Sequence, residues 1–218
     1  MSFRALFGEE RMEARDCLRY LAEQVHTTVV ATVDDDGLPV TAAIDMMDAD
    51  ETGLYFLTAV GKGFYRRLKA RGYLALTGTN GADTMHCVAV SVRGRVTELG
   101  PGLLGRLFEK NPYMAEIYPT EASRAALTVF KIDAGSGEWF DLSKRPIERF
   151  SFAFGGEAKK PSGYRITDAC TACGACLSVC PQSCITPDSP YRIEQTHCLH
   201  CGNCLSVCPV GAVRKEAP

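Results

Sequence analysis

The chain has 218 residues, of which 46% are hydrophobic and 23% charged, values typical of a globular protein with at least one buried core. Its formal net charge of −2 gives no indication of a nucleic-acid partner or of an anionic membrane surface. Cysteine is unusual in its placement, because nine of the 11 cysteines lie from Cys170 onward.

Apolar stretches and the placement of the cysteines indicate the cellular compartment that we expect for the protein. The first residues contain no apolar core of signal-peptide length, and no stretch reaches the roughly 20 apolar residues of a transmembrane helix. A secreted disulfide scaffold distributes its cysteines, whereas thiols crowded at one end of a cytosolic chain are typical of metal binding. We therefore expect a cytoplasmic protein with no membrane partner, whose thiols bind metal.

In chain order, a helix is followed by short strands. Residues 9–25 place apolar side chains on one helical face, and the hydrophobic period then changes to two. The pattern predicts strands at 27–33, 38–44, 54–58, 73–77, 84–99 (bent at Gly94), 126–132, 138–142 and 148–154, and helical segments near 102–110 and 120–126. Many antiparallel strands with few helices predict a mainly β fold, a small barrel.

A segment rich in Gly, Lys, Pro and Ser, residues 155–163, interrupts every periodicity. We interpret it as a linker between a domain at 1–154 and a domain at 164–218. The alternative is an ordinary surface loop within one domain.

The last part of the chain is an internal repeat. The run Leu177-Ser178-Val179-Cys180-Pro181 recurs 28 residues later at 205–209. A repeated unit of this size is too small to fold by hydrophobic burial alone, so another interaction has to stabilise it.

The repeat contains the pattern Cys-x2-Cys-x2-Cys-x3-Cys-Pro twice. In such a run three thiolates bind one 4Fe–4S cluster, and the fourth cysteine binds the opposite cluster. The spacing therefore predicts two crossed ligand sets, Cys170, Cys173, Cys176 and Cys208 for one cluster and Cys198, Cys201, Cys204 and Cys180 for the other. Zinc is the alternative metal, but it has no use for a third and fourth cysteine in this repeated order.

Residues 163–214 resemble the bacterial two-cluster ferredoxin domain in both motifs, both prolines and the repeated Tyr-x-Ile before each motif. The resemblance implies a small α+β fold and low-potential transfer of single electrons. Cys184 aligns with Ala212 of the second repeat, and we expect it to pack near a cluster without binding iron. His197 and His200 flank the second motif. We expect them to be solvated, although hydrogen bonds to cluster sulfide are the alternative.

Residues 27–142 resemble the pyridoxamine 5′-phosphate oxidase-like family of FMN-binding split barrels. The resemblance rests on Asp36-Gly37-x-Pro39 and on Leu54–Thr58 followed by Gly61-Lys62 and Tyr73-x-Ala75. It implies a six-stranded antiparallel split barrel with flanking helices, and a homodimer with flavin at its interface. It also implies that Thr58 and Lys62 hold the flavin phosphate, and that the second strand, with Thr41 and Ala42, runs along the ring.

The residues around Lys62 support a phosphate site on physical grounds. Lys62 lies between two glycines, and a helix that begins near Gly63 would offer its N-terminal amides to an anion. Thr41 stands where the family often has a basic residue, which leaves part of the phosphate site unassigned. We expect Arg67, Lys69 and Arg71 to be solvated, and Arg66 stays open.

Several other residues carry weaker indications. Trp139 either stacks near the flavin ring from a neighbouring subunit or belongs to a core or interface. His26 and His86 are expected to be structural, with haem ligation as the alternative. Cys17 and Cys87 are interpreted as small apolar residues.

The leading hypothesis is a flavin and iron–sulfur oxidoreductase in which the clusters exchange electrons with FMN, for reduction of a small organic substrate. Its electrons would come from or go to a redox partner protein or a small-molecule acceptor. The alternatives are a ferredoxin-type electron carrier with no substrate of its own, and a barrel that binds haem or deazaflavin. No catalytic residue is identified by the sequence.

Overall fold

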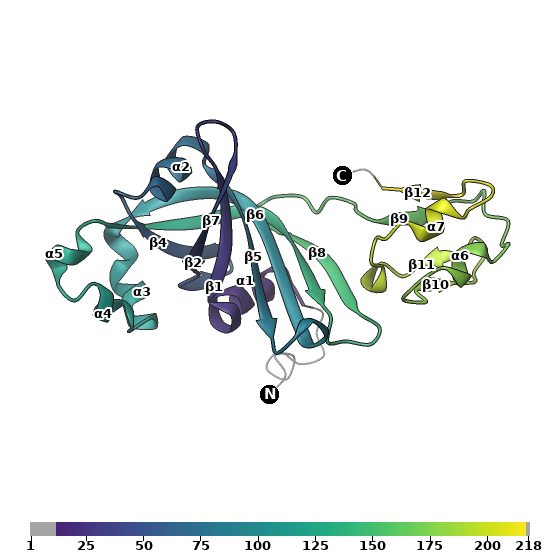
Figure 1. Ribbon diagram of the computed structural model, residues 1–218, viewed down its shortest axis with the longest axis horizontal. Helices are drawn as coiled ribbons and strands as arrows, with labels where there is room; N and C mark the ends of the chain where they lie inside the picture. The colour runs from purple at the N-terminus through teal and green to yellow at the C-terminus, as the bar shows by residue number, and fades with distance from the viewer. Residues whose placement is uncertain (1–11, 217–218) are drawn as a thin grey trace. The chain divides into compact units, whose positions relative to one another are not determined.

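The computed structural model describes residues 12–216, so the first residues of the helix expected at 9–25 lie outside the described part. The chain forms two compact units (Figure 1). The first contains the described residues up to 80, with 89–137 and 152–158. The second contains 81–88, 138–151 and the described residues from 159 onward.

One antiparallel sheet dominates the first unit, and some of its strands extend into the second. In the described part of the chain it has eight strands in the order β2-β1-β5-β6-β7-β4-β3, with β8 paired to β7. The strands are β1 (Thr27–Val33), β2 (Pro39–Asp45), β3 (Asp48–Asp50), β4 (Gly53–Ala59), β5 (Tyr73–Gly81), β6 (Cys87–Gly100), β7 (Leu127–Asp141) and β8 (Glu148–Phe154).

The first hairpin shows how sequence determines this sheet. Side chains of β1 alternate between buried and exposed, with Val30 fully buried and Val29 56% exposed. The turn after β1 is stabilised by Asp34, whose carboxylate accepts hydrogen bonds from the amides of Asp36 and Leu38. Gly37 adopts a φ of +83°, which the turn requires and glycine permits.

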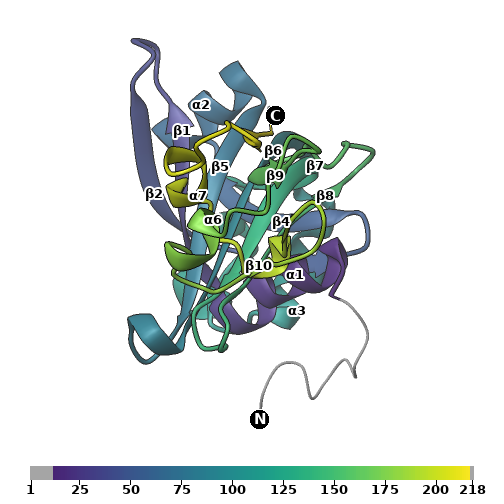
Figure 2. The same ribbon diagram turned by 90° about the vertical axis from the view of Figure 1, so that its right-hand side faces the viewer.

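Short helices border the sheet. The first unit contains α1 (Ala14–Tyr20) continued by a π-helical turn (Leu21–Val25), α2 (Gly63–Arg71), a 3-10 turn (Pro101–Leu103), α3 (Leu104–Lys110), α4 (Met114–Ile117) and α5 (Glu121–Arg124). Figures 1 and 2 show α2 beside the β1–β2 hairpin, and Figure 1 shows α3–α5 grouped beyond β4. Gly72 ends α2 in the left-handed conformation.

Two of the expected strands are joined in the structure, and their glycines explain why. The strands expected at 126–132 and 138–142 form one continuous strand, β7, because the glycines between them allow a close approach to β6. A Cβ on Gly94 would lie 2.4 Å from the carbonyl oxygen of Ala134, and one on Gly135 would lie 2.3 Å from that of Arg93. Residues 84–86 form a 3-10 turn instead of the start of a strand.

The second unit contains the repeat. Its elements are β9 (Tyr164–Ile166), α6 (Ala175–Ser178), β10 (Ile185–Thr186), β11 (Arg192–Ile193), a 3-10 turn (Gln195–His197), α7 (Asn203–Ser206) and β12 (Val213–Lys215). β9 pairs with β12 and β10 with β11, so strands from the two ends of the repeat meet. The expected linker, residues 155–163, contains no helix or strand, and it is exposed except for Gly163, which is buried. No helix in the described part combines the length and apolar composition that a membrane span needs.

Candidate cofactor sites

Two cavities in the second unit are lined by cysteine thiols. One, with about 310 Å³ of empty space that includes solvent at its opening, is lined by Cys170, Cys173, Cys176 and Cys208. The other, with about 330 Å³ measured in the same way, is lined by Cys180, Cys198, Cys201 and Cys204. The structure therefore brings together the cysteines that the spacing assigns to each cluster, three from one motif and the fourth from the other. Four thiols around one cavity are the donor set of a 4Fe–4S cluster.

The loops that carry the two cysteine motifs have the same backbone conformation at equivalent positions of the repeat. Ala172 and His200, which occupy equivalent positions 28 residues apart, both have φ near +55° (55° and 56°), and Gly174 and Gly202 have φ of 82° and 83°. These left-handed residues curl the chain so that successive thiols point to one centre. Holding non-glycine residues in this conformation costs free energy, which is typical of a ligand-binding loop.

The fourth cysteine of each motif lies in a backbone environment suited to a thiolate. Although burial acts to raise the pKa of Cys180, backbone N–H groups of residues 182–184 lower it below the usual value. The pKa of Cys208 is lowered by N–H groups of residues 210–213 against the same effect of burial. Burial instead raises the pKa of Cys176 and Cys204. Iron binds the thiolate form, so the amides after each proline favour ligation there.

Cys184 is a fifth thiol in the larger cavity. It is buried, and its Sγ lies 3.5 Å from Sγ of Cys180. Burial and this hydrogen bond raise its pKa, so Cys184 stays a neutral thiol.

The two histidines expected to be solvated are half-buried in the structure. Nδ1 of His197 lies 2.9 Å from the carbonyl oxygen of Ile147, within the second unit. The ring of His200 lies against Gly163, where a Cβ would come within 2.5 Å of Nε2. Burial and the charge of Arg149 lower the pKa of His200.

In the first unit, Thr58 provides an unusual polar atom. Its side chain is buried, and its Oγ1 has no hydrogen-bond partner among the described residues. The register pairs Thr58 with Thr128 of β7, near the end of β4. A buried hydroxyl without a partner costs stability, so its retention is typical of a group that binds a ligand.

The turn after β4 leads into α2 and supplies positive charge. Lys62 is the N-cap residue of α2, is exposed, and has no side-chain partner among the described residues. Arg67 is not freely solvated, contrary to expectation. Its Nε donates to Oγ1 of Thr32 over 2.8 Å, and its Nη1 would lie 3.2 Å from a Cβ on Gly63. A guanidinium therefore lies beside the first turn of α2, where helix amides attract anions.

The other basic residues of α2 have separate partners. Lys69 donates to Glu98 over 2.8 Å, Arg71 to the carbonyl oxygen of Asp34 over 2.9 Å, and Arg66 approaches Asp35 at 3.6 Å. Lys69 and Arg71 are therefore bound at the surface instead of being merely solvated. Arg67 is the residue that the sequence interpretation missed, although its place one helical turn after Gly63 was the available signal.

The residues expected along the flavin ring are divided between two faces. Thr41 is exposed on β2 opposite Ala31, and Ala42 points to the other face, opposite the buried Val30. Trp139 is only 3% exposed and stacks on Phe150, with ring centroids 6.1 Å apart. This burial within one chain favours the core alternative for Trp139.

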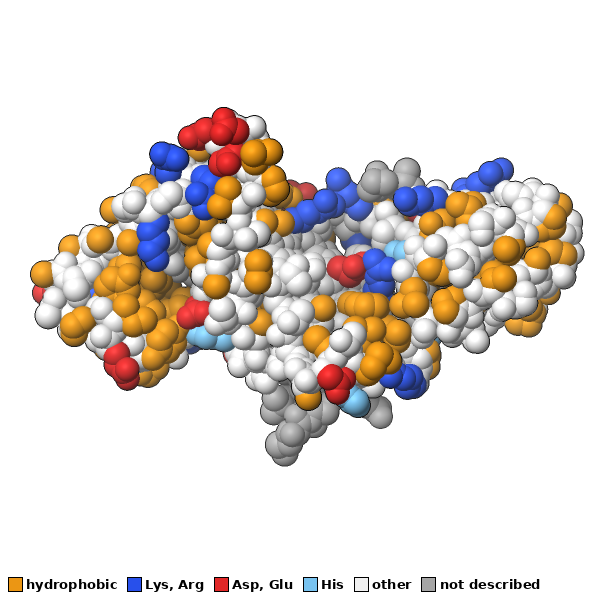
Figure 3. All heavy atoms as spheres, in the orientation of Figure 1, with side chains coloured by type: hydrophobic (Ala, Val, Ile, Leu, Met, Phe, Trp, Pro, Cys, Tyr) orange, Lys and Arg blue, Asp and Glu red, His pale blue; other side chains and the backbone are white. Residues whose placement is uncertain are grey.

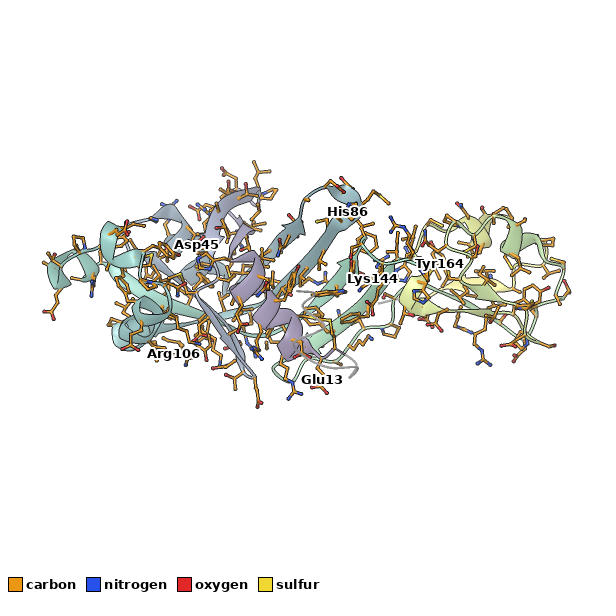
Figure 4. The ribbon with its side chains drawn as sticks, turned by 90° about the horizontal axis from the view of Figure 1, so that it is seen from below. Glu13, Asp45, His86, Arg106, Lys144 and Tyr164 are labelled. Atoms are coloured by element: carbon orange, nitrogen blue, oxygen red, sulfur yellow. The ribbon has the colours of Figure 1, made fainter. Side chains whose placement is uncertain are left out.

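Three titratable side chains meet at the end of β2, a cluster that no sequence motif indicated. The Tyr113 hydroxyl donates to Oδ2 of Asp45 over 2.6 Å, and Nε2 of His26 lies 2.8 Å from the same hydroxyl oxygen. Thr27 donates to the other carboxylate oxygen over 2.6 Å. Figure 4 labels Asp45 within the first unit. Because Thr41, Ala43 and Asp45 alternate along β2, they share one face of the sheet.

This cluster has a defined charge state. Burial acts to raise the pKa of Asp45, but hydrogen bonds from Thr27 and Tyr113 and the charge of His26 lower it overall. Burial and the bond to Asp45 raise the pKa of Tyr113. The carboxylate is therefore ionised and the phenol neutral near neutral pH. His86, the other barrel histidine, contacts only Asp83 among the described residues, at 2.9 Å.

Comparisons with known proteins agree with this architecture. The sequence model of the pyridoxamine 5′-phosphate oxidase family matches residues 14–138, and that of a 4Fe–4S dicluster domain matches residues 169–212. A ferredoxin from Butyribacterium methylotrophicum is 46% identical over 35 residues, which are 16% of this chain and 64% of that protein. The match therefore spans less than two thirds of that relative.

Two solved structures share the fold of the first unit. One is a NimC/NimA family protein from Clostridium acetobutylicum, with a TM-score of 0.52 and 15% identity over 65% of this chain and 95% of that one. Another is a heme binding protein from Mycobacterium smegmatis, with a TM-score of 0.51 and 13% identity over 65% of this chain and 58% of that one. At these identities the likeness concerns the fold alone. The chain belongs to the pyridoxamine 5′-phosphate oxidase family and carries a 4Fe–4S dicluster domain at its C-terminal end.

Proposed function

We propose that the protein is an oxidoreductase in which two 4Fe–4S clusters exchange single electrons with FMN in the split barrel, for reduction of a small organic substrate. The observation that carries this proposal is the pair of cavities that are each lined by four motif cysteines, three from one motif and one from the other, in a chain whose other part has the fold of a flavoprotein family. Bound FMN would supply the conversion between one-electron and two-electron chemistry.

The residues around α2 are suited to the phosphate of FMN. Thr58 offers a buried hydroxyl with no partner among the described residues, and Lys62 an exposed ammonium. Arg67 places a guanidinium beside the first turn of α2, and guanidinium groups bind phosphate oxygens in a bidentate manner. We propose that Arg67 supplies the positive charge that Thr41 of β2 lacks.

The His26–Tyr113–Asp45 cluster is suited to deliver a proton to substrate. The neutral Tyr113 hydroxyl is the donor, and Nε2 of His26 can return a proton to the phenolic oxygen that it already contacts. Tyr113→Phe should then lower substrate reduction, while reduction of the flavin by the clusters stays unchanged.

The exposed face of the β1–β2 hairpin supports a homodimer. Val29 and Val33 of this face are 56% and 40% exposed, and the alternate residues of β2 on it, Thr41 and Ala43, are small. Figure 3 shows hydrophobic side chains dispersed over these strands. Val29 and Val33 lie on the same face of β1, and we propose that a second copy of the chain covers them. We further propose a cytoplasmic location and a redox partner protein or small-molecule acceptor, since cluster thiols need a reducing compartment.

One anaerobic purification tests the proposal. Iron, acid-labile sulfide and released flavin are measured on the same sample, and about eight iron and eight sulfide per chain are expected for two clusters, with about one FMN. Stoichiometric zinc with no iron would contradict the cluster assignment. The reduced protein is then mixed with a quinone or a nitroarene, and oxidation of the flavin is followed by absorbance.

The remaining outcomes identify the alternatives. If the reduced protein is reoxidised only by another electron-transfer protein and by neither small acceptor, the chain is an electron carrier. If full clusters form but added FMN does not bind, titration with haem and with a deazaflavin identifies the other cofactors that this barrel could hold. Either result overturns the proposed flavin enzyme.

A further inference from the structure

The larger thiol cavity contains one cysteine sulfur more than the smaller. Each is lined by four motif cysteines and by one tyrosine, Tyr164 in the larger and Tyr191 in the smaller. The larger also contains Cys184, whereas the smaller has Ala212 at the equivalent position of the repeat. Cys184 and Ala212 are both buried, with exposed fractions of 6% and 1%. Solvent therefore does not screen the difference between the thiol at one position and the methyl group at the other.

The extra thiol is placed to donate a hydrogen bond to a cluster ligand. Sγ of Cys184 lies 3.5 Å from Sγ of Cys180, which we assign to the cluster of the larger cavity, and Cys184 also interacts with the thiol of Cys198. A 4Fe–4S cluster takes four thiolates, and the motifs already supply four, so Cys184 remains a thiol with a proton to donate.

A hydrogen bond to a ligand sulfur changes the reduction potential in a defined direction. Reduction adds one negative charge to the cluster and its thiolates, and a donor to sulfur stabilises that added charge. The potential of a cluster therefore rises with hydrogen bonding to its sulfurs.

A second difference between the loops has a smaller electrostatic effect. Nη1 of Arg149 donates to the carbonyl oxygen of Leu199, in the loop of the larger cavity, over 3.0 Å. The guanidinium is paired with Glu138 at 2.6 Å, so its charge is balanced locally. In the other loop the carbonyl of Ala172 accepts a hydrogen bond from the neutral Tyr191 hydroxyl. Backbone N–H groups donate to ligand sulfur at equivalent positions of both cavities, from Ala172 and Ala212 in the smaller and from His200 and Cys184 in the larger. The thiol of Cys184 is an additional side-chain donor in the larger cavity.

We propose that Cys184, by donating its S–H to Sγ of Cys180, raises the potential of the cluster in the larger cavity above that of the other. The first electron that enters the second unit from a low-potential one-electron donor then resides on that cluster. The step transfers one electron and no proton, and Cys184 stays protonated throughout. Cys184 thus acts through its ligand neighbour Cys180 to determine which cluster is reduced first. The proposal rests on the two clusters of the proposed function.

Four variants of the full, cluster-loaded protein test the proposal. Cys184→Ala removes the donor, Cys184→Ser replaces it by a hydroxyl donor, and Ala212→Cys introduces a thiol at the equivalent place in the other cavity. The double variant Cys184→Ala/Ala212→Cys moves the donor from one cluster to the other. Each is titrated anaerobically with dithionite and redox mediators, with EPR to follow reduction. Paramagnetically shifted cysteine β-proton signals show which cluster is reduced first.

Wild-type protein should take up its two cluster electrons in separate steps. Cys184→Ala should lower the first midpoint, changing the partition of the electron between clusters by about threefold to tenfold, the effect of one neutral hydrogen bond. Cys184→Ser should retain the wild-type order. Ala212→Cys should raise the second midpoint, and the double variant should exchange the order.

Two results would overturn the proposal. One is a Cys184→Ala protein with two intact clusters and unchanged midpoints. The other is an equal shift in Cys184→Ala and Cys184→Ser, which would indicate a packing effect instead of a hydrogen bond. Failure of the proposed function is distinguishable, because the wild-type protein would then lack two four-iron clusters.

Discussion

The hydroxyl of Tyr113, at the start of α4, donates a hydrogen bond to Oδ2 of Asp45, at the end of β2, over 2.6 Å. Sixty-eight residues separate the two in the sequence, and Nε2 of His26 approaches the same hydroxyl from a third element. The bond joins an α-helical segment to an exposed sheet face and fixes the ionisation state of both groups.

This bond has consequences for stability at acid pH. The pKa of Asp45 is lowered in the folded protein, so its contribution to stability is present above the unfolded value of about 3.9 and is lost as pH falls through the folded value. Asp45→Asn should therefore lose less stability than wild type between about pH 5 and pH 2. Tyr113→Phe removes one of the hydrogen bonds that lower the folded pKa of Asp45, so it should also reduce the loss of stability at acid pH, by less than Asp45→Asn does. Urea unfolding at a series of pH values measures both, with Asp36→Asn in the exposed turn as control.

The hydroxyl of Thr58 is buried and has no hydrogen-bond partner among the described residues, so replacing it should have opposite effects on stability and on flavin binding. Thr58→Val removes a buried group that has no partner among the described residues, so the flavin-free protein should gain about 1 kcal/mol or more in free energy of unfolding. The same change should weaken FMN binding. Denaturant unfolding and flavin fluorescence measure the two effects. Loss of stability in the flavin-free variant would contradict the reading of Thr58 as a ligand-binding residue.

Arg67 predicts discrimination between phosphorylated and unphosphorylated flavin. Arg67→Gln should weaken FMN binding by about tenfold to a hundredfold, as expected for the loss of a charge-assisted hydrogen bond, and should leave riboflavin binding unchanged. The matched control is Arg71→Gln, which removes an arginine of the same helix whose partner is the carbonyl oxygen of Asp34. Equal losses for FMN and riboflavin would indicate a structural role through Thr32.

The ion pairs of Asp48 predict that removing their cations destabilises the protein more than removing the carboxylate charge. Its side chain is only 3% exposed and pairs with Arg106 and Lys110, which are 39% and 53% exposed. The double variant Arg106→Met/Lys110→Met leaves a buried carboxylate with no cation beside it and only the amide of Ala49 as a hydrogen-bond donor among the described residues, and it should cost about 3–5 kcal/mol. Asp48→Asn leaves two cations that water can reach and should cost less. Chemical denaturation compares the two, and a larger loss for Asp48→Asn would contradict this account.

Crossed ligation predicts which double substitutions spare a cluster. Cys180→Ala/Cys198→Ala removes two ligands that line one cavity, so one complete cluster should remain, with about four iron per chain. Cys170→Ala/Cys180→Ala removes one ligand from each cavity and should damage both clusters. Iron and sulfide analysis with EPR of the reduced protein distinguishes the two. Ligation of each cluster by a single motif would give the reverse result.

Much of the molecule was predictable from local sequence. The alternation in β1, the Asp34–Gly37 turn and the repeated cysteine motifs each depend on a few consecutive residues, and the structure has a hairpin and two thiol cavities at these places. The mainly antiparallel β fold and the family were also identified correctly from such patterns. Periodicity did not predict that β7 runs without a break, because that depends on how closely β6 approaches its glycines.

The sequence by itself determined the cysteine sets, the basic turn before α2 and the fold class, because spacing and hydrophobic period are local properties of the chain. Only the tertiary structure decided that Arg67 turns toward Thr32 and Gly63, that Cys184 lies beside Cys180, and that Tyr113 and His26 meet at Asp45. These contacts depend on which buried faces pack together. No local pattern encodes that choice, and it sets the hydrogen-bond partners and pKa values of the groups that carry the chemistry.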